Sequence, residues 1–277
     1  MINLKIFFYD NDSFLNRLNP LSKVVTSLPF IFLICLINEI WIPLAFIVFT
    51  AFIVLVLGKI PLIRFLKILA PISIFFISIF ILFLLASRSD LTVGSPVLFS
   101  IGKFHFYEYS VRLGLIYAIR IFALLILILP FSLTTEPSTF IRSLIQNLNI
   151  PYKFSYGVMV AFRFIPMIET EFNVVRSAHK VMGFSDDKGI FSYFNKIKRY
   201  SIPFIVNSIR LGGRTALSMD SRAFGAFENR TYFKTLTFNR NDWIYIFAYW
   251  IIGLLIFIVA YKFGLMGKIG FYIGEFR

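Results

Sequence analysis

Long apolar runs interrupted by one extended charged segment constrain the fold of this chain most strongly. The apolar runs cover residues 24–38, 44–57, 68–86, 111–134 and 242–263. A helix needs roughly 20 apolar residues to cross a bilayer. Since 58% of the residues are hydrophobic and only 15% are charged, the sequence predicts an all-α, polytopic membrane protein with about five transmembrane helices.

The first two apolar runs are short for a full crossing. A break at residues 39–43 separates them, and we interpret them as two closely spaced spans joined by a tight turn. A single tilted or re-entrant segment is the alternative. Residues 59–67 carry three cations and are predicted to form a basic loop. Residues 87–109 are mixed in character, which fits either a short hairpin or a loop.

The charged segment lies between the fourth and fifth apolar runs. Residues 136–240 hold 15 of the 28 basic residues and 7 of the 14 acidic ones. Lipid penalises charges, and Lys and Arg gather on the cytoplasmic side of membrane proteins. We therefore predict a membrane region at 1–135, a cytoplasmic region at 136–240 and a last span within 241–277. One cation, Arg120, lies deep in the fourth run and is expected to face a protein interior or polar cavity.

Apolar residues recur at helical spacing within the charged segment. The patterns cover residues 152–183 and 190–224, and they predict two long amphipathic helices that lie on or just under a membrane. Pro166 and Pro203 fall inside these patterns. Each proline either only kinks its helix or provides the bend that turns a cytoplasmic helix beneath the bilayer.

A lone arginine among small residues stands near the end of the second pattern, in Ser218-Met219-Asp220-Ser221-Arg222-Ala223-Phe224-Gly225. Small neighbours let a partner surface come close, and a guanidinium donates several hydrogen bonds in a fixed fork. Arg222 beside Asp220 could instead be an exposed charge pair of little consequence. The residues alone leave both readings open.

The sequence does not indicate a catalytic activity. There is no Gly-rich phosphate-binding loop and no His-Glu-x-x-His pattern, so neither ATP hydrolysis nor metalloprotease activity is predicted. No metal site and no cofactor are expected, and the single Cys35 cannot form a disulfide within the chain. The net charge of +14 reflects the cytoplasmic bias of cations better than binding to nucleic acid.

The chain resembles the transmembrane coupling component (T component) of energy-coupling factor transporters, a branch of ABC importers for vitamins and metal ions. The resemblance covers nearly the whole length. It is carried by residues 15–23, which are similar to the family's opening "hxLdPrxK" stretch, by Phe162-Arg163-Phe164-Ile165-Pro166 leading into Glu169 and Glu171, and most specifically by residues 216–225 followed by Asn229-Arg230-Thr231.

The resemblance implies two cytoplasmic coupling helices, each ending in an Ala-Arg-Gly-type triplet that docks in a groove of one of two ATPase subunits. The second triplet corresponds to Ser221, Arg222 and Ala223. The first falls at Val181, Met182 and Gly183, where Met182 replaces the expected arginine. For that arm two readings stay open: a nearby cation substitutes, or the arm docks by apolar packing. The candidate cations are Lys180 and Arg176.

The resemblance also implies a separate, small substrate-binding membrane subunit (S component) and a place in the plasma membrane of a prokaryote. The competing function is a stand-alone secondary transporter or channel, which normally places acids or broken helices at the membrane midplane. The apolar runs contain almost no acids and show no evident repeat. A membrane enzyme is a third reading, for which the catalytic residues are missing.

Overall fold

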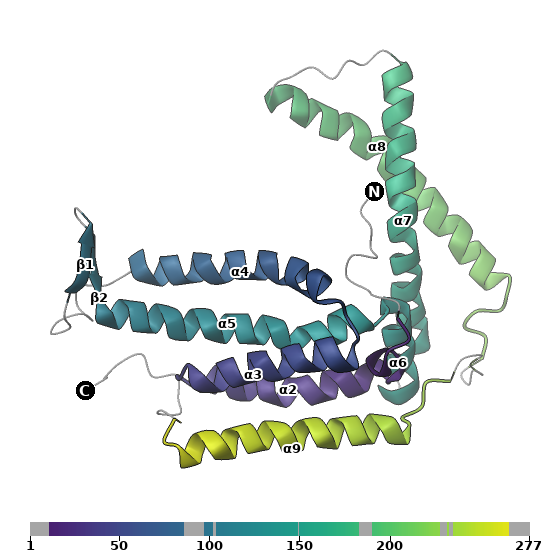
Figure 1. The fold of residues 1–277 in the computed structure, drawn as a ribbon. Coiled ribbons are helices and arrows are strands. Elements are labelled where there is room, and N and C mark those ends of the chain that lie inside the picture. The colour runs from purple at the N-terminus through teal and green to yellow at the C-terminus, as the bar shows by residue number, and fades with distance from the viewer. Residues whose placement is uncertain are drawn as a thin grey trace. The chain divides into compact units, whose positions relative to one another are not determined.

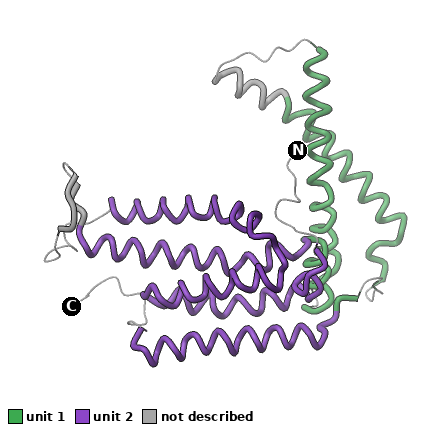
Figure 2. The backbone as a smooth tube through the Cα atoms, viewed as in Figure 1, with its two compact units in different colours: residues 1–3, 137–236 green, residues 4–136, 237–277 purple. Residues whose placement is uncertain are grey.

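The computed structural model describes residues 11–85, 97–101, 104–148, 150–182, 190–227, 232 and 235–265, and most of them are helical (Figure 1). The chain divides into two compact units (Figure 2). Unit 1 contains residues 1–3 and 137–236, and unit 2 contains residues 4–136 and 237–277. Each unit is described by itself below.

Unit 2 is a bundle of apolar helices, which confirms the all-α membrane class. Among its described residues, three helices are long and apolar enough to cross a membrane, and two shorter apolar helices precede them. In chain order its helices are α1 (Phe14–Arg17), α2 (Pro20–Leu36), α3 (Trp41–Phe52) continued by the π-helical turn η2 (Ile53–Leu57), α4 (Leu62–Leu85), α5 (Glu108–Thr134) and α9 (Arg240–Lys262). Helix α5 packs against α2, α3 and α4, while α9 packs against α2 and α3.

Two boundaries differ from the sequence-based prediction. From their charge we predicted that Arg64 and Lys67 lie in a basic loop. That prediction was wrong, because helix α4 begins at Leu62 and both residues lie in its first turns. Between α4 and α5 the chain forms an antiparallel hairpin of β1 (Val97–Ile101) and β2 (Phe104–Tyr107). Of the two readings for residues 87–109, the hairpin is the one observed.

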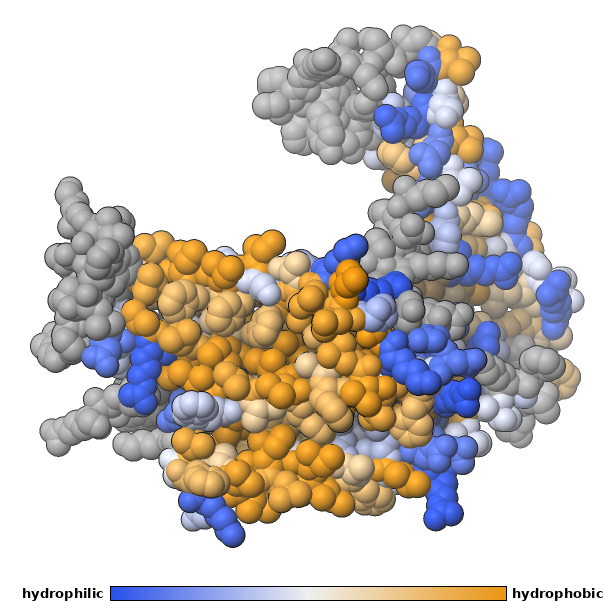
Figure 3. All heavy atoms as spheres, in the orientation of Figure 1, coloured by the Kyte–Doolittle hydropathy of each residue, from blue (hydrophilic) through white to orange (hydrophobic). Residues whose placement is uncertain are grey.

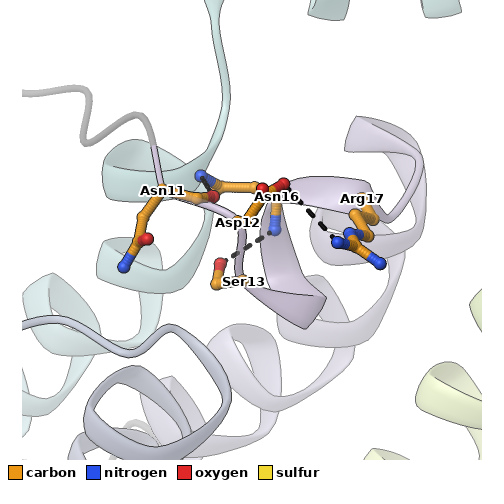
Figure 4. A network of polar contacts seen from close by, with 5 residues as sticks. All are labelled: Asn11, Asp12, Ser13, Asn16 and Arg17. Carbon is orange, nitrogen blue, oxygen red and sulfur yellow. Dashed lines mark hydrogen bonds and ion pairs between the residues drawn. The ribbon is translucent and has the colours of Figure 1, made fainter.

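A polar network shapes the chain just before α2 (Figure 4). The backbone N–H of Asn16 donates to Ser13 Oγ over 3.2 Å, and its side-chain amide donates to the Asn11 carbonyl over 2.6 Å. Ser13 is thereby the N-cap of the short helix α1. The neighbouring Asp12–Arg17 ion pair spans 3.5 Å between side chains that are 94% and 73% exposed. Such an exposed pair adds little stability, so the cap is what organises this turn.

The core of unit 2 is aromatic where α2, α3 and α9 meet. The ring of Phe30 lies 5.1 Å from Phe46 and 5.5 Å from Tyr249, measured between ring centroids. Both phenylalanines are almost fully buried. Gly253 of α9 lies directly under the Phe30 ring, and a Cβ at this position would overlap the ring. The missing side chain therefore allows α2 and α9 to approach closely.

Gly253→Ala is expected to destabilise the bundle, because overpacking a filled core typically costs about 1–3 kcal/mol. Gly157 in unit 1 is the matched control, since a Cβ there meets nothing within 4 Å and alanine favours a helix over glycine. In detergent, thermal unfolding followed by tryptophan fluorescence should show a lower midpoint for Gly253→Ala alone. Equal midpoints for the two variants would contradict the close packing.

Arg120 lies near the middle of α5 and is only 9% exposed, as expected from its depth in the sequence. Its guanidinium donates to the carbonyl of Ile37 and, over 2.6 Å, to Asn38 Oδ1. It also lies 5.0 Å from the centroid of the Tyr117 ring. Ile37 is the C-cap of α2, so this cation bonds to one backbone carbonyl at the end of that helix and to one side-chain amide oxygen just beyond it.

Apolar side chains cover most of the face of unit 2 that is seen in Figure 3. Helix α4 packs on α5 but leaves large side chains uncovered, among them Ile74, Phe75 and Leu82, which are 57–69% exposed. Polar side chains gather toward the ends of the bundle (Figure 3). Lipid supplies the apolar partner that such a surface lacks in water.

Unit 1 contains α6 (Pro137–Leu148), α7 (Tyr152–Val181) and α8 (Ile190–Asp220). Helices α7 and α8 contact each other through rings: Phe172 lies 5.9 Å from Tyr200 and 6.4 Å from Phe204, and His179 lies 5.0 Å from Tyr200. We refer to this set of four rings as the aromatic crossing. Pro166 and Pro203 both lie inside continuous helices.

Candidate partner-docking site

The end of α8 forms a hydrogen-bonded C-terminal cap. The N–H of Phe224 donates to the Met219 carbonyl over 3.0 Å, and the N–H of Ala223 donates to the Asp220 carbonyl over 2.9 Å. These two bonds are the pair that defines a Schellman motif. The prediction that this helix continues to Phe224 was wrong, because the backbone turns at Ala223 and the helix ends at Asp220.

Ala223 occupies the left-handed position of this cap, with a φ of 55°. Glycine usually holds that position because a Cβ is unfavourable there. A side chain in this region costs on the order of 1 kcal/mol. The backbone by itself therefore favours a small third residue in the triplet.

Ala223→Gly is expected to stabilise the end of α8 by about 1 kcal/mol, since glycine adopts the left-handed conformation without strain. Ala223→Val should have the opposite effect, because a β-branched side chain is poorly accommodated at positive φ. Hydrogen exchange of the amides at residues 217–224, measured by mass spectrometry in detergent, should slow in the first variant and accelerate in the second. Unchanged exchange in both would contradict the cap.

Arg222 directly precedes the left-handed position of the cap. Its side chain is exposed, as are those of Asp220, Ser221 and Ala223. Among the residues that the structure describes, its guanidinium has neither a hydrogen bond nor an ion pair. The Asp220–Arg222 pair proposed as the simpler reading is therefore not formed. Ser221 Oγ donates to the Ser218 carbonyl over 3.0 Å.

An aromatic clamp fastens this cap to the start of α7. The Phe224 ring lies 5.8 Å from Tyr152 and 5.7 Å from Tyr156, in edge-to-face geometry. The hydroxyl of Tyr152 also donates to the Phe227 carbonyl over 2.9 Å. Sequence reasoning missed these aromatic residues, since nothing in their local pattern indicates a contact more than 60 positions away.

The first triplet lies at the opposite end of α7, which is about 45 Å long at 1.5 Å per residue. Val181 is 88% exposed and Met182 is 60% exposed, while Gly183 lies outside the described residues. The N–H of Met182 donates to the Ala178 carbonyl over 3.1 Å and ends the helix. Arg176 and Lys180 are both exposed nearby. The structure does not bring the two triplets together.

A buried polar node in unit 2 was also missed by sequence reasoning. Lys23 is 2% exposed, and its ammonium donates to the Thr134 carbonyl over 3.0 Å, to Thr134 Oγ1 over 2.8 Å and to Thr135 Oγ1 over 3.2 Å. It thus joins the first turn of α2 to the last turn of α5, whose carbonyl groups lack helical partners.

The acidic member of the same node is Asp242, which is also 2% exposed. Its Oδ1 accepts the N–H of Asn19 over 2.7 Å, and its Oδ2 accepts the N–H of Asn239 over 2.7 Å. Since Asn19 and Asn239 are the N-caps of α2 and α9, one carboxylate bonds to the starts of two helices. The Asn239–Asp242 spacing is a capping-box signal that could have been read from the sequence.

Comparison with known proteins identifies the family to which this chain is related. Residues 11–233 match the CbiQ family, described as a cobalt transport protein. The chain is 30% identical over 262 residues to the energy-coupling factor transporter transmembrane protein EcfT of Streptococcus thermophilus, covering 89% of this chain and 94% of the relative.

Further relatives of the same description come from other bacteria. The EcfT protein of Exiguobacterium sibiricum is 27% identical over 253 residues, and that of Bacillus subtilis is 24% identical over 253 residues. The alignments cover 88% of this chain in both cases, and 94% and 93% of the relatives. With its membrane bundle, its two long helices and these relatives, the chain belongs to the CbiQ/EcfT family of transmembrane components of energy-coupling factor transporters.

Proposed function

We propose that this chain is the coupling subunit of an ATP-driven importer for a vitamin or a metal ion. It joins two ABC-type ATPase subunits to a separate, small substrate-binding membrane subunit (the S component). Residues 136–240 lie in the cytoplasm, where their charges are hydrated. The observation that carries the proposal is Arg222, an exposed cation without a partner among the described residues, held at a capped helix end.

The proposed mechanism is mechanical. The second triplet docks through Arg222, and the first docks through the exposed apolar pair Val181 and Met182. When the ATPase dimer closes, it moves the docked ends of α7 and α8. The aromatic crossing joins the two helices, so a displacement of one helix is passed to the other and then to the bound S component.

The surface offered to the S component is the uncovered apolar side of α8. Ile202, Ile205 and Ile209 are 53–68% exposed at helical spacing. An apolar surface of this kind can bind and release a membrane partner without requiring fixed hydrogen bonds. A stand-alone transporter or channel is the weaker candidate, since within the described spans the carboxylates of Glu108 and Asp242 lie in first turns and not at the midplane.

Affinity purification in mild detergent tests the proposal. Two ATPase subunits and a small membrane protein are expected to co-purify with the chain, and ATP hydrolysis should follow the ATPase subunits. The chain freed of them should hydrolyse no ATP, because it has no phosphate-binding loop. Uptake by the purified chain alone in proteoliposomes would instead favour the stand-alone transporter.

Cysteine labelling tests the proposed topology. Asn173→Cys in a Cys35→Ser background should resist a membrane-impermeant maleimide added to intact cells and react after permeabilisation, because Asn173 is an exposed residue of α7 on the cytoplasmic side. Ser100→Cys, which the topology places outside, is the control and should react in intact cells. Rapid labelling of Asn173→Cys in intact cells would contradict the topology.

A further inference from the structure

A second cation lies beside the docking cap of α8. A Cβ built on Gly225 would lie 3.3 Å from Cε and 3.6 Å from Nζ of Lys153, so the ammonium of Lys153 lies against the turn that follows Arg222. Lys153 belongs to the first turn of α7. Two helices thus contribute charge to one small surface, although their cations are 69 positions apart in the sequence.

The two tyrosines of the aromatic clamp lie before and after Lys153 on α7. Tyr152 directly precedes it and bonds to the Phe227 carbonyl, while Tyr156 lies one turn later and contacts the Phe224 ring. The turn at residues 224–227 is therefore attached to α7 on both sides of the lysine. Gly225 has a φ of 91° and no side chain, which leaves room for the lysine stem to cross the turn.

Neither cation is neutralised by the residues that the structure describes. The side chains of Lys153 and Arg222 are exposed, and no hydrogen bond or ion pair to another described residue engages either of them. The carbonyl end of α8 stabilises nearby positive charge only modestly. A partner that covers this surface must remove water from both cations, and it gains affinity only if it supplies acceptors for both.

We propose that Lys153 is a second docking residue and that the ATPase groove receiving Arg222 is acidic, with a carboxylate positioned for the Lys153 ammonium. This inference rests on the proposed docking of α8 to an ATPase subunit. It distinguishes the two arms by chemistry: the second arm presents two cations to an acidic groove, while the first arm presents the exposed apolar pair Val181 and Met182.

The test compares charge-removing variants in the co-expressed transporter. Lys153→Met keeps the aliphatic stem and removes the charge, and Lys153→Arg keeps the charge. Arg210→Met is the control, since Arg210 is an exposed cation on α8 about 18 Å before Arg222. The immobilised membrane subunits, freed of ATPase, are titrated with purified ATPase subunits in neutral detergent at several KCl concentrations.

We expect Lys153→Met to weaken ATPase binding about three- to tenfold at low salt and to flatten its salt dependence. Lys153→Arg and Arg210→Met should bind like the wild type. If Lys153→Met binds normally while Arg222→Ala does not, the inference is wrong and the proposed function stands. If neither variant weakens binding, the proposed docking itself fails.

Two other outcomes would also overturn the inference. A loss that is equal at all salt concentrations and accompanies a lower unfolding midpoint would mean that Lys153 only supports the cap of α8. A loss that appears only in vesicles containing anionic lipid, and not in neutral detergent, would mean that Lys153 binds lipid headgroups and not the ATPase.

Discussion

Arg222→Ala is expected to release most of the ATPase from the transporter and to abolish solute uptake. Removing one partner of a buried, hydrogen-bonded charge contact at an interface typically costs 2–5 kcal/mol, and even 2 kcal/mol weakens binding about 30-fold. Arg222→Glu should be worse, since it replaces attraction by repulsion. Co-purified ATPase and uptake in proteoliposomes measure both effects.

Met182→Ala is the matched comparison at the first triplet. Met182 is 60% exposed and carries no charge, so truncation removes only apolar contact and should reduce attachment less than Arg222→Ala. Met182→Arg should be tolerated if that groove still accepts a guanidinium. Normal assembly and transport in Arg222→Ala would refute the docking role of the second triplet.

Asp242→Asn is expected to destabilise unit 2 strongly. The amide retains one oxygen but directs an NH₂ group at a backbone N–H, of Asn19 or of Asn239, that the carboxylate now accepts. It also removes the charge that interacts with the buried ammonium of Lys23. Leaving a buried donor without its acceptor typically costs about 1–3 kcal/mol, which corresponds to a fall in unfolding temperature on the order of 5 °C.

Asp12→Asn provides the control for Asp242→Asn. The Asp12–Arg17 pair is exposed on both sides, so removing its charge should change stability by well under 1 kcal/mol. Size-exclusion chromatography after a heating series in detergent measures both variants together. Comparable losses of folded protein in the two would show that the polar node does not stabilise the bundle.

The membrane spans could be predicted because lipid leaves few alternatives. A long apolar run must satisfy its own backbone, so it forms a helix, and a deep cation such as Arg120 must face protein. Helix ends were harder to predict. The end of α8 depends on a left-handed backbone at Ala223, and alanine does not indicate such a position as glycine would.

The candidate site was predictable only in part, for a related reason. The small residues around Arg222 predicted a docking motif from local sequence alone, and its docking role stays a prediction. The supports of the motif are long-range: Tyr152 and Lys153 reach the cap of α8 only through the folded arrangement of unit 1. No periodicity or spacing in one sequence indicates such contacts.

Because Asp242 belongs to the last span, its bond to the start of α2 can form only late in synthesis. During synthesis α2 is made long before α9, and the two bonded residues Asn19 and Asp242 are 223 positions apart. Until Asp242 enters the membrane, the Asn19 N–H lacks its acceptor and Lys23 lacks its nearby negative charge. The early helices can insert into the membrane without this bond, but the bundle reaches its final packing only after α9 has been made.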